Sequence, residues 1–262
     1  RYPFRSYALH WGNPDATHVG NAVAGLIPEG GGENPRCAGL LSPCTGYAGW
    51  WRFDDTDPEI AHDSSTSRHH GTVLGAAVYA AGRPGNSLAL DGIDDYVSLL
   101  NAVLDGAGAL SFEISSWREE GPILPTLLSA ANSERSNELL LTLQLEQSEA
   151  EIRTLQGGRH FFPVPSALGV WQRWAIRRDG GGLIRLHLDS QAMGSSSAPV
   201  TQLQVDEGAL LLGTEQDCSG GCFQDSQWWK GRIDEVRVMR RALAADELLH
   251  FPLASTSLGA FT

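Results

Sequence analysis

Short apolar runs separated by turn clusters fill the chain from Trp50 onward. In the clearest run, 139–145, leucine stands at each odd position, and polar residues stand at most of the even ones. Successive side chains of a β-strand point to opposite faces of a sheet, so a period of two predicts half-buried strands. The pattern favours an all-β sandwich or barrel. The same alternation recurs in 173–177, 184–188 and 232–239.

The two ends of the chain depart from this pattern. Residues 1–48 contain Asn-Pro pairs and a Gly-Gly-Gly run without a sustained period, which indicates an irregular segment or part of a carrier module. The run 243–249 is rich in Ala, Asp, Glu and Leu and predicts one short C-terminal helix of about two turns. We therefore expect a β-domain over 49–252 and a tail over 253–262.

Composition limits the classes of partner. The 262 residues are 42% hydrophobic and 19% charged, which excludes disorder for most of the chain. A formal net charge of −12 repels phosphate backbones, so nucleic acid is not an expected partner. No run reaches the roughly 18 apolar residues of a membrane helix, so no membrane insertion is expected in this chain, which we interpret as a processed or trimmed fragment.

The four cysteines form two close pairs. Cys37 and Cys44 enclose six residues, and Cys218 and Cys222 enclose three. Zinc is one interpretation, but its usual C-x2-C spacing is absent. Two local disulfides fit better and imply an extracellular, cell-surface or periplasmic location. Such short disulfides close little chain, so their expected role is to shape loops.

Several motifs together resemble a known family. The stretches 49–55 (GWWRFDD), 62–65 (HDSS), 88–97 (LALDGIDDYV) and 231–238 (GRIDEVRV) resemble laminin-G-like domains. The segment 212–227, beginning Leu-Gly-Thr-Glu-Gln-Asp, resembles the pentraxins within the same superfamily. The resemblance implies a concanavalin A-like jelly roll of two antiparallel sheets.

The best chemical candidate is the oxygen-rich loop 215–227. Calcium prefers six to eight hard oxygen ligands, and pentraxins bind calcium with the matching run and an earlier loop. Ser136 and Gln224 stand where the family has carboxylates, so one weaker site is expected. The alternative is a solvated acidic hairpin without an ion. The resemblance implies these metal ligands: Asn137, Glu215, Gln216 through its carbonyl, Asp217, Gln224 and Gln227.

The tryptophans divide into two groups. Five lie on strand-like segments and are expected mostly in the core: Trp50, Trp51, Trp117, Trp171 and Trp174. Trp228 and Trp229 directly follow the calcium-like loop, and strand alternation predicts that one of them points outward. An exposed indole could stack on a sugar, so both are candidate ligand-binding residues together with Ser136. The alternative is packing against a neighbouring loop.

Catalysis has little support. Glycosidases need a pair of carboxylates, and no closely alternating acidic run such as E-x-D-x-E is present. The aspartates of the first loop, including Asp63, are interpreted as turn residues, with a structural metal site as the alternative. We therefore expect no enzyme activity.

The combined prediction is a calcium-dependent, lectin-like binding and adhesion module. It would recognise a glycan or another extracellular ligand and belong to a secreted or cell-surface bacterial protein, such as an adhesin or a pilin. Surface-fibre or pilus subunits are further expected partners. Two alternatives remain: a structural assembly module of a surface fibre without a small ligand, and an accessory domain of a glycoside hydrolase.

Overall fold

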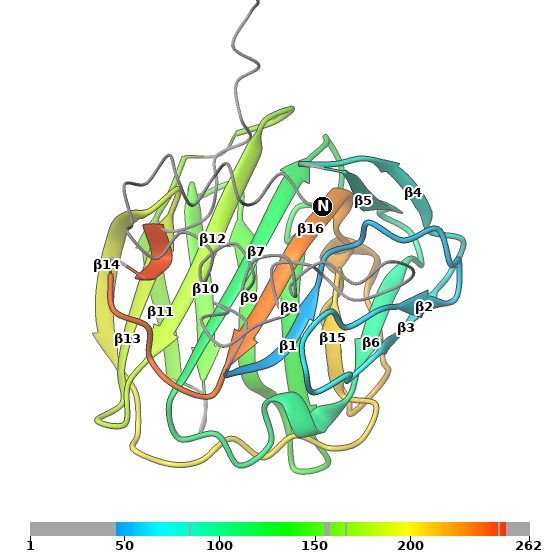
Figure 1. Ribbon diagram of the computed structural model, residues 1–262. Coiled ribbons are helices and arrows are strands. Elements are labelled where there is room, and N and C mark those ends of the chain that lie inside the picture. The colour runs from blue at the N-terminus through cyan, green and yellow to red at the C-terminus, as the bar shows by residue number, and fades with distance from the viewer. Residues whose placement is uncertain (1–45, 84, 155–157, 166, 246, 250–262) are drawn as a thin grey trace, which may run out of the picture.

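The structure, a computed structural model, consists of two stacked antiparallel sheets of eight strands each (Figure 1). It describes residues 46–249 except 84, 155–157, 166 and 246. Sheet A has the order β14 (Gln191–Ser197), β13 (Leu183–Leu188), β12 (Trp171–Arg178), β7 (Leu110–Arg118), β16 (Lys230–Met239), β5 (Asn86–Asp91) and β4 (Val78–Ala81), with β1 (Tyr47–Trp51) also paired to β16. Sheet B has the order β11 (Gly158–Pro163), β10 (Glu149–Thr154), β9 (Arg135–Gln144), β8 (Thr126–Asn132), β15 (Leu210–Leu212), β6 (Tyr96–Leu99), β3 (Gly71–Leu74) and β2 (Ile60–Ala61). The predicted jelly-roll class is confirmed.

The core lies between the sheets and follows the alternation of the sequence. On β9 the leucines at 139, 141 and 143 enter the core, and on β12 Trp174 and Ile176 do so from the other sheet. Arg173 and Arg177 alternate with these core residues along β12 and therefore lie on the outer face of sheet A.

Strand β16 contains a bulge that the sequence pattern did not reveal. Val236 and Val238 share the core face as predicted, but Ile233, three residues before Val236, is also in the core. The register with β7 shifts between Asp234 and Arg237, and Glu235 has a φ of 50°. An extra residue in one strand resets its alternation, so both halves of β16 keep an apolar inner face.

The C-terminal helix is shorter than the two turns that the sequence predicts. A 3-10 helix over Glu247–Leu249 stands at this place in the described residues. The Leu243 N–H donates to Ser111 Oγ at 2.8 Å, and Leu243 and Leu248 pack on the outer face of sheet A beside Met239. These contacts attach the segment to the sheet.

The predicted domain boundaries, before residue 49 and after residue 252, lie close to the two ends of the described part of the chain. Strand β1 begins at Tyr47, two residues before the predicted boundary, and residues 1–45 and 253–262 lie outside the described part. Within the described residues, no helix is long and apolar enough to cross a membrane.

Candidate functional site

The oxygen-rich loop joins β15 to β16 and is anchored to sheet B by Gln216. This side chain is fully buried. Its amide nitrogen donates to the carbonyl and hydroxyl oxygens of Ser129 and to the Ala209 carbonyl, at 3.3, 3.2 and 2.9 Å. Its amide oxygen accepts a 2.6 Å hydrogen bond from the Gly220 N–H. The side chain is therefore structural, which leaves the backbone carbonyl of Gln216 as its candidate metal ligand.

Glu215 gathers two of the other predicted ligands. Its carboxylate is 1% exposed and accepts hydrogen bonds from Gln227 Nε2, at 3.0 Å, and from the Asn137 side chain. Arg153 on β10 lies 3.1 Å from the same carboxylate. Burial raises the pKa of Glu215, and the positive charge of Arg153 opposes that shift. The structure thus brings Asn137, which is distant in sequence, to Glu215 and Gln227 of the loop.

Asp217 and Gln224 form the exposed part of the loop. The Gln224 amide nitrogen donates to the Asp217 carboxylate, so two further predicted ligands meet. Asp217 also lies close enough to Glu215 for the repulsion between the two carboxylates to raise the pKa of Glu215. The side chain of Ser136 lies outside the described residues.

A disulfide closes the tip of this loop. Cys218 and Cys222 are bonded, as predicted, with Cα atoms 5.4 Å apart. The Gly221 N–H donates to the Cys218 carbonyl at 3.0 Å within the same turn. The bond fixes the segment between Asp217 and Gln224, which carries both exposed ligands. The other predicted pair, Cys37 and Cys44, lies outside the described residues.

The expectation that Trp228 or Trp229 would be exposed is wrong. They are 5% and 1% exposed, respectively. Trp228 packs with the rings of Phe223 and Tyr96, at centroid distances of 5.2 and 6.1 Å, and Trp229 is part of the core. The pair precedes β16 rather than lying within it, so strand alternation does not apply to it. Both tryptophans therefore pack inside the protein, as the alternative to a ligand-binding role proposed.

The donor set of the loop fits a hard cation. It consists of carboxylate, amide and backbone carbonyl oxygens, which Ca²⁺ prefers, and it contains no available thiolate or imidazole. Gln227 Oε1 is buried and has no hydrogen-bond partner among the described residues. A buried acceptor without a donor is costly, and a cation would satisfy it. Arg153 is the opposing feature, because its guanidinium already neutralises part of the charge of Glu215.

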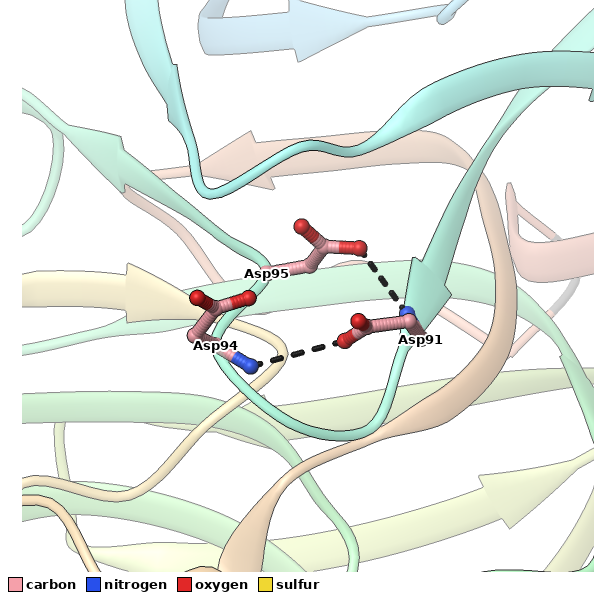
Figure 2. Close-up of side chains that lie close together, drawn as sticks. All are labelled: Asp91, Asp94 and Asp95. Atoms are coloured by element: carbon pink, nitrogen blue, oxygen red, sulfur yellow. Dashed lines mark hydrogen bonds between the residues drawn. The ribbon is translucent and has the colours of Figure 1, made fainter.

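A second acidic cluster, Asp91, Asp94 and Asp95, lies in the turn between β5 and β6 (Figure 2). One oxygen of each lies within 4.8 Å of the others. Asp95 accepts hydrogen bonds from the N–H groups of Ala76 and Asp91, and Asp91 accepts one from Ile93 at 2.8 Å. These are bonds that build a turn, and they account for the cluster without an ion.

Turn chemistry also describes the first-loop aspartate Asp63. Its carboxylate accepts hydrogen bonds from the N–H groups of Trp50 and Ser65, at 2.8 and 2.7 Å, and from that of His69 at 2.7 Å. Asp63 thus supports its own turn through Ser65 and also ties β1 to this loop through Trp50.

Sequence reasoning missed Arg153 and misplaced two tryptophans. Arg153 reaches Glu215 across 62 positions, and no local motif marks it. One sequence signal was available: Arg153 and Glu151 are two positions apart on a predicted strand and therefore share a face, which is the outer face of sheet B. Trp117 and Trp171, expected in the core, lie half-buried on the outer face of sheet A.

The comparison with protein families identifies the superfamily. A laminin G family model described as the concanavalin A-like lectin/glucanases superfamily matches residues 91–249. The chain belongs to this superfamily. The match covers the candidate loop and most strands of both sheets.

Individual relatives are more distant. Pentraxin-4 from Homo sapiens is 29% identical over 151 residues, which cover 55% of this chain but only 31% of pentraxin-4. Domain 4 of AbnA, an extracellular GH43 arabinanase from Geobacillus stearothermophilus solved with arabinotriose, aligns with a TM-score of 0.57 and 19% identity over 78% of this chain and 96% of that domain. A Trypanosoma rangeli sialidase aligns with a TM-score of 0.64 and 13% identity over 94% of this chain and 40% of the sialidase. The two structural similarities establish the fold alone.

Proposed function

We propose that this chain is a calcium-dependent, lectin-like binding module of an extracellular or cell-surface bacterial protein. Calcium would be held by the loop between β15 and β16 and by Asn137, and it would supply open coordination positions for hydroxyl or anionic groups of a glycan. The orphaned oxygen Gln227 Oε1 carries this proposal, because it is a buried acceptor beside a carboxylate that already holds two predicted ligands. The disulfide and the oxidising location that it implies fit an adhesive role.

The residues of the chain have separate tasks in this proposal. Gln216 and the Cys218–Cys222 bond hold the loop in shape, which lowers the ordering cost of binding. Glu215 and Asp217 supply the negative charge, and Arg153 stabilises Glu215 while no cation is bound. Because Gln224 brings no charge and Arg153 opposes the ion, we expect a weak site. No catalytic step is assigned to this domain.

Isothermal titration of calcium into chelator-treated protein tests the site. We expect one weak site in the parent protein and no binding heat in Asp217→Asn, whose exposed side chain can change without loss of the fold. The matched control is Asp94→Asn, which removes an equal charge from the other acidic cluster and should bind calcium like the parent. Absence of heat at millimolar calcium in the parent, or loss of binding in Asp94→Asn alone, would contradict the proposal.

A second candidate is the role of accessory domain in a glycoside hydrolase. The fold similarity to domain 4 of the arabinanase covers nearly all of that domain and provides the precedent. Titration of arabinotriose with and without calcium separates the two. Binding that requires calcium supports the first role, and binding to arabinotriose that is unchanged by chelation supports the second.

A further inference from the structure

The outer face of sheet A carries a pair of tryptophans that the calcium proposal does not use. Trp171 on β12 and Trp117 on β7 are direct cross-strand partners. Their rings pack edge to face with centroids 6.0 Å apart, and both side chains are half-buried. Strands β7, β12 and β16 lie side by side in this sheet (Figure 1).

Exposed apolar side chains border the pair. The loop before β12 exposes 49% of Leu168 and 47% of Val170. Between them, the Gly169 N–H donates to the Arg118 carbonyl at 2.9 Å, which ties the loop to the end of β7. Gly169 has a φ of 67°, and a Cβ there would lie 3.8 Å from the Trp117 ring. The loop therefore extends the tryptophan surface with further apolar area.

Arginines adjoin the tryptophans on the same face. Arg232 on β16 pairs in register with Trp117, and its guanidinium lies 5.6 Å from the centre of that ring. Arg173 follows Trp171 by two positions on the same face of β12, and its guanidinium contacts Ser190 Oγ. One guanidinium thus lies over a tryptophan ring and a second lies one row further along the same face, in a protein whose net charge is −12. We call Trp117, Trp171, Arg173 and Arg232 the Trp–Arg patch.

Acidic side chains lie near the patch as well. Glu113, whose pKa burial raises to about 7, and Asp189 interact with Arg173 and offset part of its charge. Asp234 pairs in register with Ser115, one row along the sheet from Arg232 and Trp117. Burial raises the pKa of Asp234 to about 8, so its carboxyl is mostly neutral at pH 7. The positive charge that a ligand could meet beside the tryptophans is therefore mainly that of Arg232.

We propose that the Trp–Arg patch binds a carboxylate-bearing sugar chain, independently of calcium. A half-buried indole such as that of Trp171 can stack on the apolar face of a sugar ring. A guanidinium matches a carboxylate in shape and charge and can bind it with two parallel hydrogen bonds. The patch lies on sheet A, whereas the calcium loop is anchored to sheet B and contacts β10 of that sheet, so the two sites are separate.

The test uses the full chain in EDTA and two matched probes. Tetragalacturonate carries carboxylates, and its methyl ester has the same backbone without the charge. We expect the anionic probe to bind at least about tenfold more tightly than the ester, as measured by titration calorimetry and tryptophan fluorescence. Equal binding of both probes, or binding of neither at millimolar concentration, would overturn the proposal. Because calcium is absent, neither result bears on the loop.

Variants then assign the contact. Trp171→Ala should weaken binding of tetragalacturonate at least about tenfold, as for an aromatic hot-spot residue. Arg232→Gln should instead abolish the preference for the acid over the ester. The matched control is Phe161→Ala, which removes an aromatic ring, 46% exposed, that lies under Arg159 on sheet B and has no tryptophan partner in the described part of the chain. A melting temperature recorded for each variant separates lost binding from lost folding. Parent-like binding by both Trp171→Ala and Arg232→Gln would refute the assignment.

Discussion

The calcium-like loop on sheet B and the Trp–Arg patch on sheet A differ in how their polar groups are held. In the loop, Gln216 and Glu215 are buried and bonded on several sides. In the patch, the rings and guanidinium groups are half-buried and lie on a regular strand ladder. The first arrangement suits a small hard ion that needs fixed oxygens, and the second suits a flat ligand that needs area. Four predictions test whether this contrast holds.

The first prediction compares the stability lost by substitutions on the two faces of β12, and it has the largest magnitude. Trp174 is fully buried, and its Nε1 donates to Ser116 Oγ at 3.1 Å, so Trp174→Ala should lower the free energy of unfolding by about 3–5 kcal/mol. Trp171→Ala removes a half-buried ring from the outer face and should cost about 1 kcal/mol. Urea denaturation measures both. Equal losses would mean that Trp171 is a structural residue, and the contrast would fail.

The second effect tests the anchoring of the loop. Gln216→Ala leaves the Gly220 N–H without its acceptor and removes the bonds to Ser129, so we expect a loss of about 2–3 kcal/mol in the free energy of unfolding. The control is Gln224→Ala at the exposed end of the loop, where the change should stay within about 0.5 kcal/mol. A neutral Gln216→Ala would show that the loop is not held to the sheet by this side chain.

The third effect concerns the buried carboxyls of sheet A. Burial raises the pKa of Asp234 from 3.8 to about 8 and that of Glu113 from 4.5 to about 7. Each acid ionises first in the unfolded chain, so its stabilising contribution is complete below the unfolded pKa and is lost as pH rises toward the folded pKa. We expect the free energy of unfolding to fall by up to about 1.4 kcal/mol per pH unit for each group across this window.

Asp234→Asn should remove the share of this pH dependence that comes from Asp234. Urea denaturation at several values between about pH 4 and pH 8 measures the slope. Val200→Ala, which shortens an exposed uncharged side chain, should leave the slope of the parent. A slope that Asp234→Asn does not reduce would place the pH dependence elsewhere in the molecule.

The smallest effect concerns the charge opposing calcium. Arg153→Gln removes a positive charge 3.1 Å from Glu215 and should strengthen calcium binding several-fold, on the order of 1 kcal/mol. Arg159→Gln is a graded control: Arg159 is paired with Glu151 and acts on Glu215 only through its charge, so we expect a smaller gain in calcium binding. Calcium titration measures both variants. Weaker binding in Arg153→Gln would mean that this guanidinium holds the loop in its binding shape.

Local patterns predicted the parts of the molecule that depend on local geometry. The odd-position leucines of β9 identified a strand and its core face, because burial selects apolar residues at every second position. The close cysteine spacing predicted the Cys218–Cys222 bond. Local periodicity failed at β16, where the bulge at Glu235 changes the alternation, and helix propensity predicted a longer helix at 243–249 than the described residues contain.

Motifs and periodicity were enough to predict a two-sheet sandwich with an oxygen-rich, disulfide-closed loop. They did not reveal that Arg153 pairs with Glu215, that Trp228 and Trp229 are buried, or that Trp117 meets Trp171 on an outer face. A period of two defines the two faces of a strand but not what covers each face. That depends on which distant strands and loops pack beside it, and such contacts are set by the fold as a whole.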